Sequence, residues 1–340
     1  MSNLRIKDIA LKAGVSEATV SRTLRSPDIV SPKTREKVMA VVDELGFTPN
    51  KLGASLRNGR SGNIVVLTPD ISNPYFSPIV RAIEKVAMSK GYSVLLGDTQ
   101  EDPAREFQFG DLVMGSQADG IIISSQRLPF NTNIHKNVLK NMPPIVSTAE
   151  LIDLQDIHKI AVDNVAISVT AVRHLIEQGH TDIAVIAGTK SHVSTKERLK
   201  GMKQALKAAG LTFDEKLVYY GDFSTQSGVD GAKALLQQKR RPTAIYCFGD
   251  MVAIGAMHAL RELDYSIPDD ISVIGIDNIN FAQYCYPPLT TVAQPLEKIG
   301  EACANTLIDL IEGRTPEKLL NIMPHELIIR GSSAAPQAKN

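Results

Sequence analysis

The chain has 340 residues, of which 43% are hydrophobic and 22% charged, and its 37 Lys and Arg balance its 37 Asp and Glu. This length allows two or three globular domains, whereas the apolar runs are far shorter than a membrane span and charged residues interrupt the segment where a signal peptide would be apolar. The three cysteines show no C-x-x-C spacing, so we expect free thiols in a reducing cytoplasm, with neither a metal site nor a cofactor.

The first predicted elements are two short helices joined by a glycine turn. From Ile6, apolar residues recur at i, i+3, i+4 and i+7, which is helical spacing. Gly14 is suited to end this helix in a left-handed conformation, and Ser16 is suited to cap a second helix that runs to about Leu24. This layout is that of a helix-turn-helix, which can place short polar and basic side chains in a DNA major groove. The exposed face of the second helix would carry Glu17, Ala18, Ser21 and Arg22.

The charge is distributed unevenly along the chain. Residues 1–60 contain 11 Lys and Arg against 6 Asp and Glu, a net charge of +5, and the other 280 residues contain 26 against 31, a net charge of −5. The neutral total therefore conceals a basic head, residues 1–60, and an acidic body formed by the rest of the chain. This distribution favours binding of the head to the phosphates of a nucleic acid. A small three-helix bundle without DNA binding is the alternative, because capped amphipathic helices are common.

A third helix is predicted over residues 30–46, with Ser31 as its cap, Pro32 at its first position and Gly46 at its end. The stretch that follows, TPNKLGASLRNGRSGN, surrounds a short helical core at residues 51–57 with turn-forming residues. It predicts a linker. Because an isolated helix of this length is not stable in water, its folding would need DNA or a second copy of the chain.

From residue 63 onward, apolar strand-like segments alternate with amphipathic helical segments. This alternation predicts parallel sheets covered on both faces, and it begins again near residue 163, so we expect two α/β units in series. Helices are expected at about 76–90, 103–115, 133–141, 164–179, 195–209, 225–238, 251–263 and 295–312. Parallel sheets bind ligands outside the carboxyl ends of their strands. The strand ends NPYF, GDTQ, SSQR, AGTK, GDFS, FGDM and IDNI are therefore predicted to line a cleft.

These segments together resemble the lactose-repressor family of bacterial transcription regulators. The head segments IKDIALKAGVSEATVSRTL, SPKTREKV and ELGFTPN carry the resemblance, and so do HLIEQGHTDIAVIAG, FGDMVAIGAMHAL, IPDDISVIGIDN and PPLTTVAQP in the body. It covers essentially the whole chain. It implies a homodimeric, cytoplasmic repressor, not an enzyme, whose affinity for double-stranded operator DNA changes with a small effector. SQRLPF, NINFAQYCYPPLTTVAQP and ELIIRGS are most similar to members that respond to cytidine and control nucleoside uptake and catabolism genes.

The resemblance also implies a domain organisation. We expect an α/β protein with a three-helix head, a short hinge helix and a periplasmic-binding-protein-like body of two parallel lobes. The expected bounds are 1–47 for the helix-turn-helix domain, 48–61 for the hinge, about 62–161 plus 293–320 for lobe one and about 162–292 plus 321–340 for lobe two. Relatives of the cytidine type act together with the cyclic-AMP receptor protein, which is a further expected partner.

For DNA binding, the resemblance implies a set of residues in the head and hinge: Ser16, Glu17, Ala18, Thr19, Ser21, Arg22, Leu56 and Arg57. Glu17 and Ala18 fall where such repressors read base edges, and Arg22 where some contact a guanine; the hydroxyls suit phosphate contacts. Leu56 falls where the hinge helix wedges a leucine into the minor groove. Packing of Leu56 against the body is the alternative. Gly53 replaces the usual alanine, which costs on the order of 1 kcal/mol in a helix interior.

For the effector, the resemblance implies Tyr75, Phe76, Arg198, Phe223, Asp250 and Asp277. The aromatic positions sandwich a base in purine-responsive relatives, and the charged positions bind ring edges or hydroxyls. Core packing is the alternative for Phe76 and Phe223. His192 and Ser194 replace residues that contact a purine, so guanine or hypoxanthine is not expected. Asp98 and Gln126 also follow strands, but a structural role is the better expectation for both.

Three other functions fit parts of the sequence. A sugar would suit the same charged and aromatic residues, so a sugar-responsive repressor is the main rival. A solute-binding module would share the body, but the basic head and the lack of a signal sequence argue against it. An enzyme is disfavoured because the sequence shows no activated nucleophile, metal cluster or phosphate loop. The cytidine-type resemblance favours an effector that relieves repression.

Overall fold

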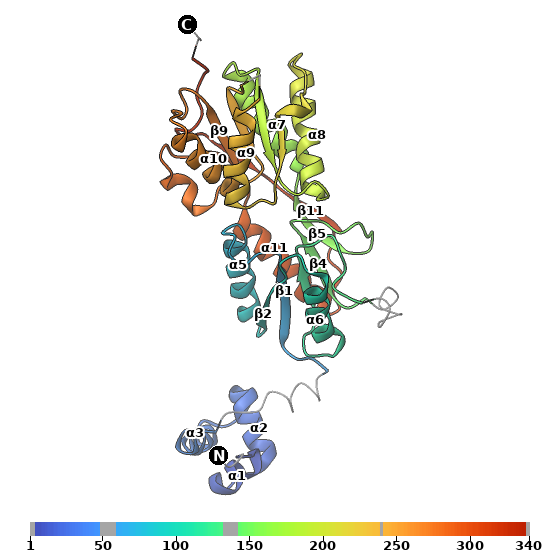
Figure 1. Cartoon of the computed structure of the whole chain (residues 1–340). Helices are drawn as coiled ribbons and strands as arrows, with labels where there is room; N and C mark the ends of the chain where they lie inside the picture. Colours follow the sequence, from blue (N-terminus) through green and yellow to red (C-terminus); the bar gives the residue numbers. More distant parts are fainter. Residues whose placement is uncertain (1–3, 48–58, 132–141, 239–240, 338–340) are drawn as a thin grey trace. The chain divides into compact units, whose positions relative to one another are not determined.

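The computed structural model describes residues 4–47, 59–131, 142–238 and 241–337. The chain divides into two compact units, Met1–Ser61 and Gly62–Asn340, which are drawn in Figure 1. The hinge core and the helix predicted at 133–141 lie outside the described residues. Within the ranges given above, every helix falls short of the length and apolar character that crossing a bilayer requires.

The head is a bundle of three helices. Its elements are α1 (Ile6–Ala13), α2 (Glu17–Arg25), the short 3-10 helix η1 (Pro27–Ile29) and α3 (Pro32–Leu45). Gly14 and Gly46 end α1 and α3 at φ values of 59° and 60°, a left-handed conformation that glycine adopts without strain. Ile9, Val20 and Val38 bring one residue from each helix into the fully buried core. The predicted order of helix, glycine turn and capped helix is confirmed.

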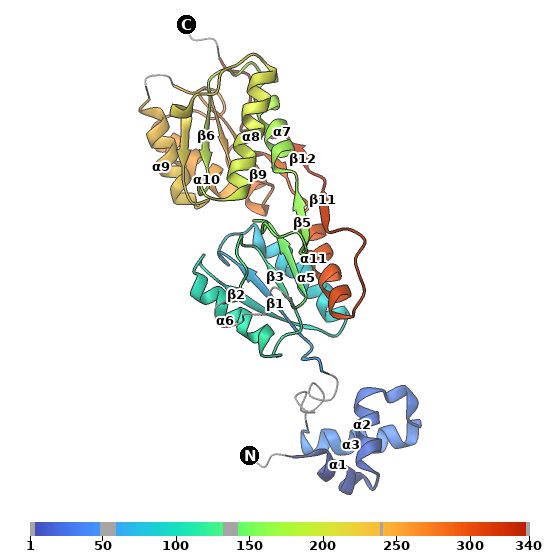
Figure 2. The same cartoon turned by 90° about the vertical axis from the view of Figure 1, so that its right-hand side faces the viewer.

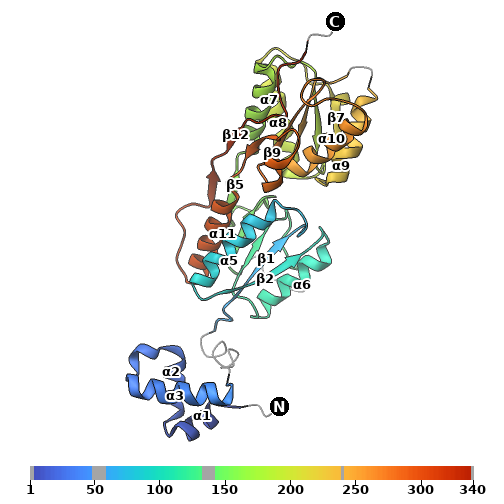
Figure 3. The same ribbon diagram turned by 90° about the vertical axis from the view of Figure 1, so that its left-hand side faces the viewer.

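Lobe one of the body is a parallel sheet with helices on both faces. Its strands lie in the order β11-β5-β4-β3-β1-β2. Helices α5 and α11 pack together over one face, and α6 covers the other (Figures 1 and 3). The elements are β1 (Asn63–Thr68), α5 (Phe76–Ser89), β2 (Ser93–Asp98), α6 (Pro103–Met114), β3 (Ile121–Ile123), β4 (Ile145–Thr148), β5 (His158–Val162), α11 (Leu296–Ile311) and β11 (Leu320–Met323).

Lobe two repeats this arrangement. Its strand order is β12-β10-β9-β8-β6-β7, and β12 alone runs antiparallel to its neighbour among the paired strands described. Helices α7 and α8 cover one face, and α9 and α10 the other. The elements are α7 (Asn164–Glu177), β6 (Ile183–Ala187), α8 (Val193–Ala208), η2 (Glu215–Leu217), β7 (Val218–Tyr220), α9 (Thr225–Leu236), β8 (Ala244–Cys247), α10 (Asp250–Glu262), β9 (Ser272–Asp277), η3 (Asn280–Tyr284), β10 (Thr290–Ala293) and β12 (Glu326–Ile328).

The apolar strands are buried on both faces, as their sequences predict. In β1, Ile64 and Val66 enter the core under α5 and α11, and Val65 and Leu67 enter the core under α6. Successive side chains of a strand point to opposite faces, so only a continuous apolar run can fill two cores. The two-lobed α/β body predicted from this pattern is confirmed.

The chain passes between the lobes after β5, after β10 and after β11. Figure 2 shows β5, β11 and β12 at the junction. Leu320–Met323 pairs with β5 as the edge strand of the lobe-one sheet, so the boundary expected near residue 320 falls a few residues later, and β12 then joins the sheet of lobe two as expected. This strand is short and lies at the edge of the sheet, where Leu320 and Ile322 stay half exposed.

Candidate functional site

In the head, the N-terminus of α2 is built by local hydrogen bonds. The Ser16 hydroxyl accepts a hydrogen bond from the Thr19 backbone N–H at 3.1 Å, and the two side-chain hydroxyls lie 2.9 Å apart. Glu17, Ala18 and Arg22 are exposed, whereas Ser21 is half buried. A capped helix with this exposed face has the form of a recognition helix. Leu56 and Arg57 lie outside the described residues.

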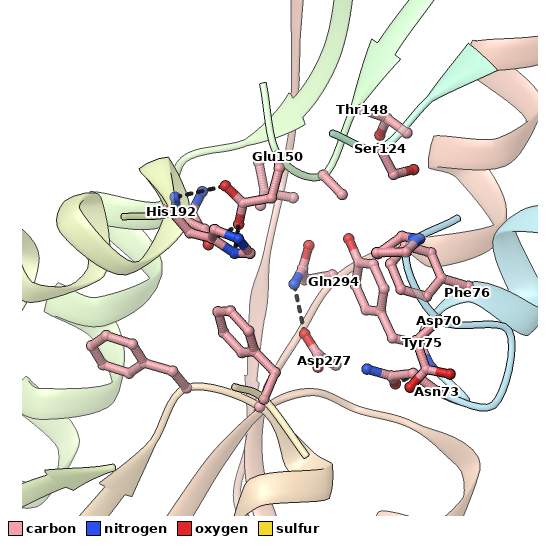
Figure 4. Close-up of a pocket in the computed structure, with 18 of the residues that line it drawn as sticks. Asp70, Asn73, Tyr75, Phe76, Ser124, Thr148, Glu150, His192, Asp277 and Gln294 are labelled. Atoms are coloured by element: carbon pink, nitrogen blue, oxygen red, sulfur yellow. Dashed lines mark hydrogen bonds and ion pairs between the residues drawn. The ribbon is translucent and has the colours of Figure 1, made fainter. Parts of the chain in front are cut away.

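In the body, a cavity lies between the two lobes at the carboxyl ends of their strands. It encloses about 1150 Å³ of space, including the solvent at its open mouth, and a cleft at this position is a usual site for a small ligand. Figure 4 shows Tyr75 and Phe76 on one side, His192 and Glu150 on the other, and Asp277 with Gln294 between them. Of the six residues predicted for the effector, five line this cavity: Tyr75, Phe76, Arg198, Phe223 and Asp277.

The aromatic walls come from both lobes. Tyr75 and Phe76 begin α5 and pack edge to face, with ring centroids 4.9 Å apart and planes at 89°. Phe223 follows β7 at a φ of 66°, and its ring stacks on the His192 ring at 5.9 Å and 23°. Gly188 makes room for Phe223, because a Cβ there would lie 1.9 Å from the phenyl Cζ. The two lobes therefore present aromatic faces to the same space.

Arg198 is held rigidly at the cavity wall. It is 7% exposed, its Nε donates to the Asn164 side-chain oxygen at 2.8 Å, and its terminal nitrogen donates to the Phe248 carbonyl. A guanidinium fixed by neutral acceptors keeps its charge, because none of these partners neutralises it. It can therefore offer its remaining N–H groups to a ligand.

Asp277 ends β9 and is 9% exposed. Gln294 donates to its carboxylate at 2.7 Å, while the side-chain oxygen of Gln294 is buried without a partner. Burial raises the pKa of Asp277 to about 7, although the nearby Arg198 guanidinium opposes this shift. A carboxyl with a perturbed pKa beside an unpartnered amide oxygen, at the end of a buried strand, is typical of a binding site.

Asp250 does not lie on the cavity wall, which corrects the expectation that it contacts the effector. Its side chain is fully buried. The Thr291 hydroxyl donates to one carboxylate oxygen at 2.6 Å, and the Ile279 backbone N–H donates to the other at 2.9 Å. Asp250 therefore ties the start of α10 to β10 and to the turn after Asp277. Asp250 belongs to the strand-end segment FGDM, and this position predicted that it would lie near the site. The sequence carries no information on the direction in which its side chain points.

Sequence reasoning missed two glutamates of the cavity. Glu150 follows β4 and Glu101 follows β2, and both approach His192, at 3.7 Å and 3.6 Å. The Ser194 hydroxyl and backbone N–H also donate to Glu150. Their position just beyond strand ends was the available signal. Asp98 and Gln126, which share that signal, are not among the lining residues.

The acidic residues do not form a metal site. Among the described residues, no group of three His, Cys, Asp or Glu side chains is placed to hold an ion. The five carboxylates on the cavity wall belong to Asp70, Glu101, Glu150, Asp222 and Asp277. Their cationic counterparts on that wall are Arg198 and His192. The cavity is therefore acidic, rich in hydrogen-bond acceptors and bounded by aromatic rings.

Comparison with known proteins agrees with both parts of the chain. Residues 5–50 match the family described as bacterial regulatory proteins, lacI family, and residues 172–333 match a periplasmic binding protein-like domain. The chain is 39% identical to the HTH-type transcriptional repressor CytR of Escherichia coli strain K12, over 97% of this chain and 96% of that protein.

Solved structures give the same result. The lac repressor dimer bound to operator and the anti-inducer ONPF matches with a TM-score of 0.85 and 29% identity, over 98% of this chain and 99% of that one. A complex of the transcriptional regulator CelR with cellobiose matches with a TM-score of 0.73 and 29% identity, over 97% and 100%.

The chain belongs to the lacI family of bacterial regulatory proteins. It is a DNA-binding transcriptional repressor whose action is modulated by a small-molecule effector, and the similar lac repressor structure is a dimer bound to operator. The prediction of a repressor rather than an enzyme is confirmed by these relatives.

Proposed function

We propose that this repressor controls genes of nucleoside uptake and catabolism, and that its effector is a nucleoside, cytidine, which relieves repression. The observation that carries the proposal is the cavity between the lobes, which combines aromatic faces with an acidic wall. The similarity to CytR supports the choice of effector. The protein would act as a homodimer on operator DNA.

The charge of the cavity bears on the kind of ligand. The wall of the cavity carries five carboxylates beside the cationic Arg198 and His192, and like charges repel one another. A phosphate group would meet this repulsion, whereas hydroxyl and amino groups would donate hydrogen bonds to the carboxylates. The cavity therefore favours an unphosphorylated nucleoside over a nucleotide.

The aromatic rings supply the other half of recognition. Phe76 and Phe223 approach from opposite lobes, and a base between two such rings gains stacking energy of about 1–3 kcal/mol for each base–ring contact. Arg198 and Asp277 lie within the same cavity and can bind ribose hydroxyls. Because Phe76 belongs to lobe one and Phe223 to lobe two, a bound base would bridge the lobes and link effector binding to their closure.

A sugar is the second candidate. The regulator CelR was solved with cellobiose and covers 97% of this chain, and carboxylates with aromatic faces also suit sugar hydroxyls and ring C–H groups. The two candidates differ in what the aromatic pair must do, because a free sugar has no base to insert between Phe76 and Phe223.

Isothermal titration of the full-length protein distinguishes these candidates. We expect saturable heat with cytidine and none with cytidine monophosphate or ribose. Heat with ribose or cellobiose, and silence with every nucleoside, would leave a repressor but refute the nucleoside effector. A fluorescence assay with labelled operator then shows whether cytidine raises or lowers the affinity for operator. We expect cytidine to weaken operator binding, and a strengthened complex would contradict relief of repression.

On the DNA side, we propose that Glu17, Ala18 and Arg22 read base edges. Ser16, Thr19 and Ser21 would contact phosphates, and Leu56 with Arg57 would enter the minor groove. Leu56→Ala should weaken binding to operator much more than binding to random DNA, because only the kinked specific complex uses the wedge. Equal losses would refute the wedge. A contact with the cyclic-AMP receptor protein stays a prediction, and it would appear as cooperative operator binding when both proteins are present.

A further inference from the structure

A donor and an acceptor from opposite lobes meet at the cavity wall. Glu150 follows β4 of lobe one, and His192 precedes α8 of lobe two. The His192 Nδ1 lies 3.7 Å from a Glu150 carboxylate oxygen, and each side chain is 15% exposed. This distance is too long for a hydrogen bond, and Nδ1 is buried without a hydrogen-bond partner. Glu150 and His192 are therefore close enough to contact the same edge of a ligand, but they do not form a hydrogen bond with each other.

Glu150 is fixed in place with acceptor capacity to spare. The Ser194 hydroxyl donates to one carboxylate oxygen, and the Ser194 backbone N–H donates to the other at 3.3 Å. An ionised carboxylate offers about four lone-pair sites, so these two donors leave sites that can accept from a ligand. Figure 4 shows the side chains of Glu150 and His192 together on one side of the cavity.

His192 is kept as a donor by a second glutamate. Its Nε2 lies 3.6 Å from the Glu101 carboxylate. Arg127 steadies the turn that carries Glu101, because it donates to the Glu101 carbonyl at 2.9 Å and pairs with the buried Glu106. The charged groups that face His192 are Glu101, Glu150 and Arg127, and the nearby Glu101 carboxylate raises the pKa of His192 although burial opposes this shift. A protonated imidazole donates from both nitrogens.

We propose that Glu150 and His192 read the ring edge of the base and select an amino base over a keto base, which means cytidine over uridine. This inference rests on the nucleoside function proposed above. Cytosine carries an amino donor beside a ring-nitrogen acceptor, so Glu150 accepts from the amino group and His192 donates to the ring nitrogen. Uracil reverses this order and turns its carbonyl oxygen toward the Glu150 carboxylate. Adenine carries the same amino donor beside a ring-nitrogen acceptor. Glu150 and His192 therefore select for an amino base, and the space in the cavity selects between a pyrimidine and a purine.

A purely structural role makes a different prediction. If Glu150, Ser194 and His192 only latch the lobes together, loss of the Glu150 charge would weaken cytidine and uridine binding by the same factor. If the pair reads the base, the ratio of the two affinities must change. An amide at position 150 can donate to the uracil carbonyl, so Glu150→Gln should favour uridine relative to cytidine.

The test is titration calorimetry of the full-length protein with cytidine, uridine and adenosine. We expect the unsubstituted protein to prefer cytidine to uridine, and Glu150→Gln to weaken cytidine about 10- to 100-fold while uridine changes little or improves. Glu84→Gln, a substitution at an exposed glutamate on α5, is the matched control and should leave both affinities unchanged. His192→Asn offers a second route to the same loss of cytidine preference if Glu150→Gln does not fold.

The outcomes separate the two proposals. No heat with any nucleoside refutes the nucleoside effector itself. The second outcome is saturable cytidine binding with the same ratio of cytidine to uridine affinity in Glu150→Gln, His192→Asn and the unsubstituted protein. It refutes base reading by Glu150 and His192 but leaves the nucleoside effector standing, even if both affinities fall by the same factor. A ratio that collapses in either folded variant supports it.

Discussion

The close approach of Phe223 to Gly188 allows a sharp test of the aromatic wall. A Cβ at residue 188 would lie 1.9, 2.2 and 2.3 Å from three carbons of the Phe223 ring. Carbon atoms in contact need about 3.5 Å, so the ring would have to shift by more than about 1 Å. The backbone of Phe223 is already held in the left-handed region. Gly188→Ala therefore moves the ring without removing it.

The magnitude follows from what the ring would do for a ligand. If Phe223 stacks on the effector base, its displacement forfeits about 1–3 kcal/mol. This loss corresponds to a roughly 5- to 150-fold increase in the dissociation constant of the effector. The fold of lobe two should survive, because Phe223 lies on the cavity wall and is only half buried.

The assay is titration calorimetry with cytidine, together with a thermal melt to show that the variant folds. Gly249→Ala is the matched control. It also lines the cavity, but a Cβ there meets only an Asp277 oxygen at 3.5 Å, an ordinary contact. We expect Gly188→Ala to lose far more affinity than Gly249→Ala. Equal affinities in a folded Gly188→Ala variant would refute the stacking role of Phe223.

Three further predictions concern the head and the stability of the body. Ser16→Ala removes the side chain that accepts from the Thr19 N–H and should cost the head about 1 kcal/mol of stability; an unchanged melt of residues 1–60 would contradict the cap. Burial lowers the pKa of His174 and His180, so the unfolded chain takes up protons first and the unfolding free energy should fall as the pH drops through about 6.5. Urea titrations at several pH values check this, and a rise toward acid pH would refute it. Operator affinity should fall steeply with added salt because a basic head displaces counterions; a flat salt dependence would exclude phosphate-dominated docking.

Local sequence was sufficient for the head and for the class of the body. Gly14, Ser16 and Gly46 act within one helical turn of their own positions, so their turn and cap roles can be read directly from the order of residues. The apolar runs of the central strands are equally local signals, because a strand buried on both faces must be apolar at successive positions. The resemblance to a known family then identified five of the residues that line the cavity.

The tertiary structure decided what depends on distant parts of the chain. The edge strand Leu320–Met323 is strand-like only because β5 is there to pair with it. Asp250 turns into the protein because Thr291 and Ile279 offer it donors, and no pattern around FGDM specifies that direction. Such contacts join residues dozens of positions apart, and local propensity carries no information about them.

The pair Glu150 and His192 shows the same limit at the site. The two residues follow strands of different sheets; the family resemblance pointed to the position of His192, whereas Glu150 alone looks like an ordinary polar residue in a turn. They meet only because the carboxyl ends of both sheets face one cavity and the chain passes between the lobes repeatedly. Sequence determined which elements form and that their strand ends carry the chemistry. The packing of two lobes decided which of those polar side chains face one another, because that choice depends on long-range geometry.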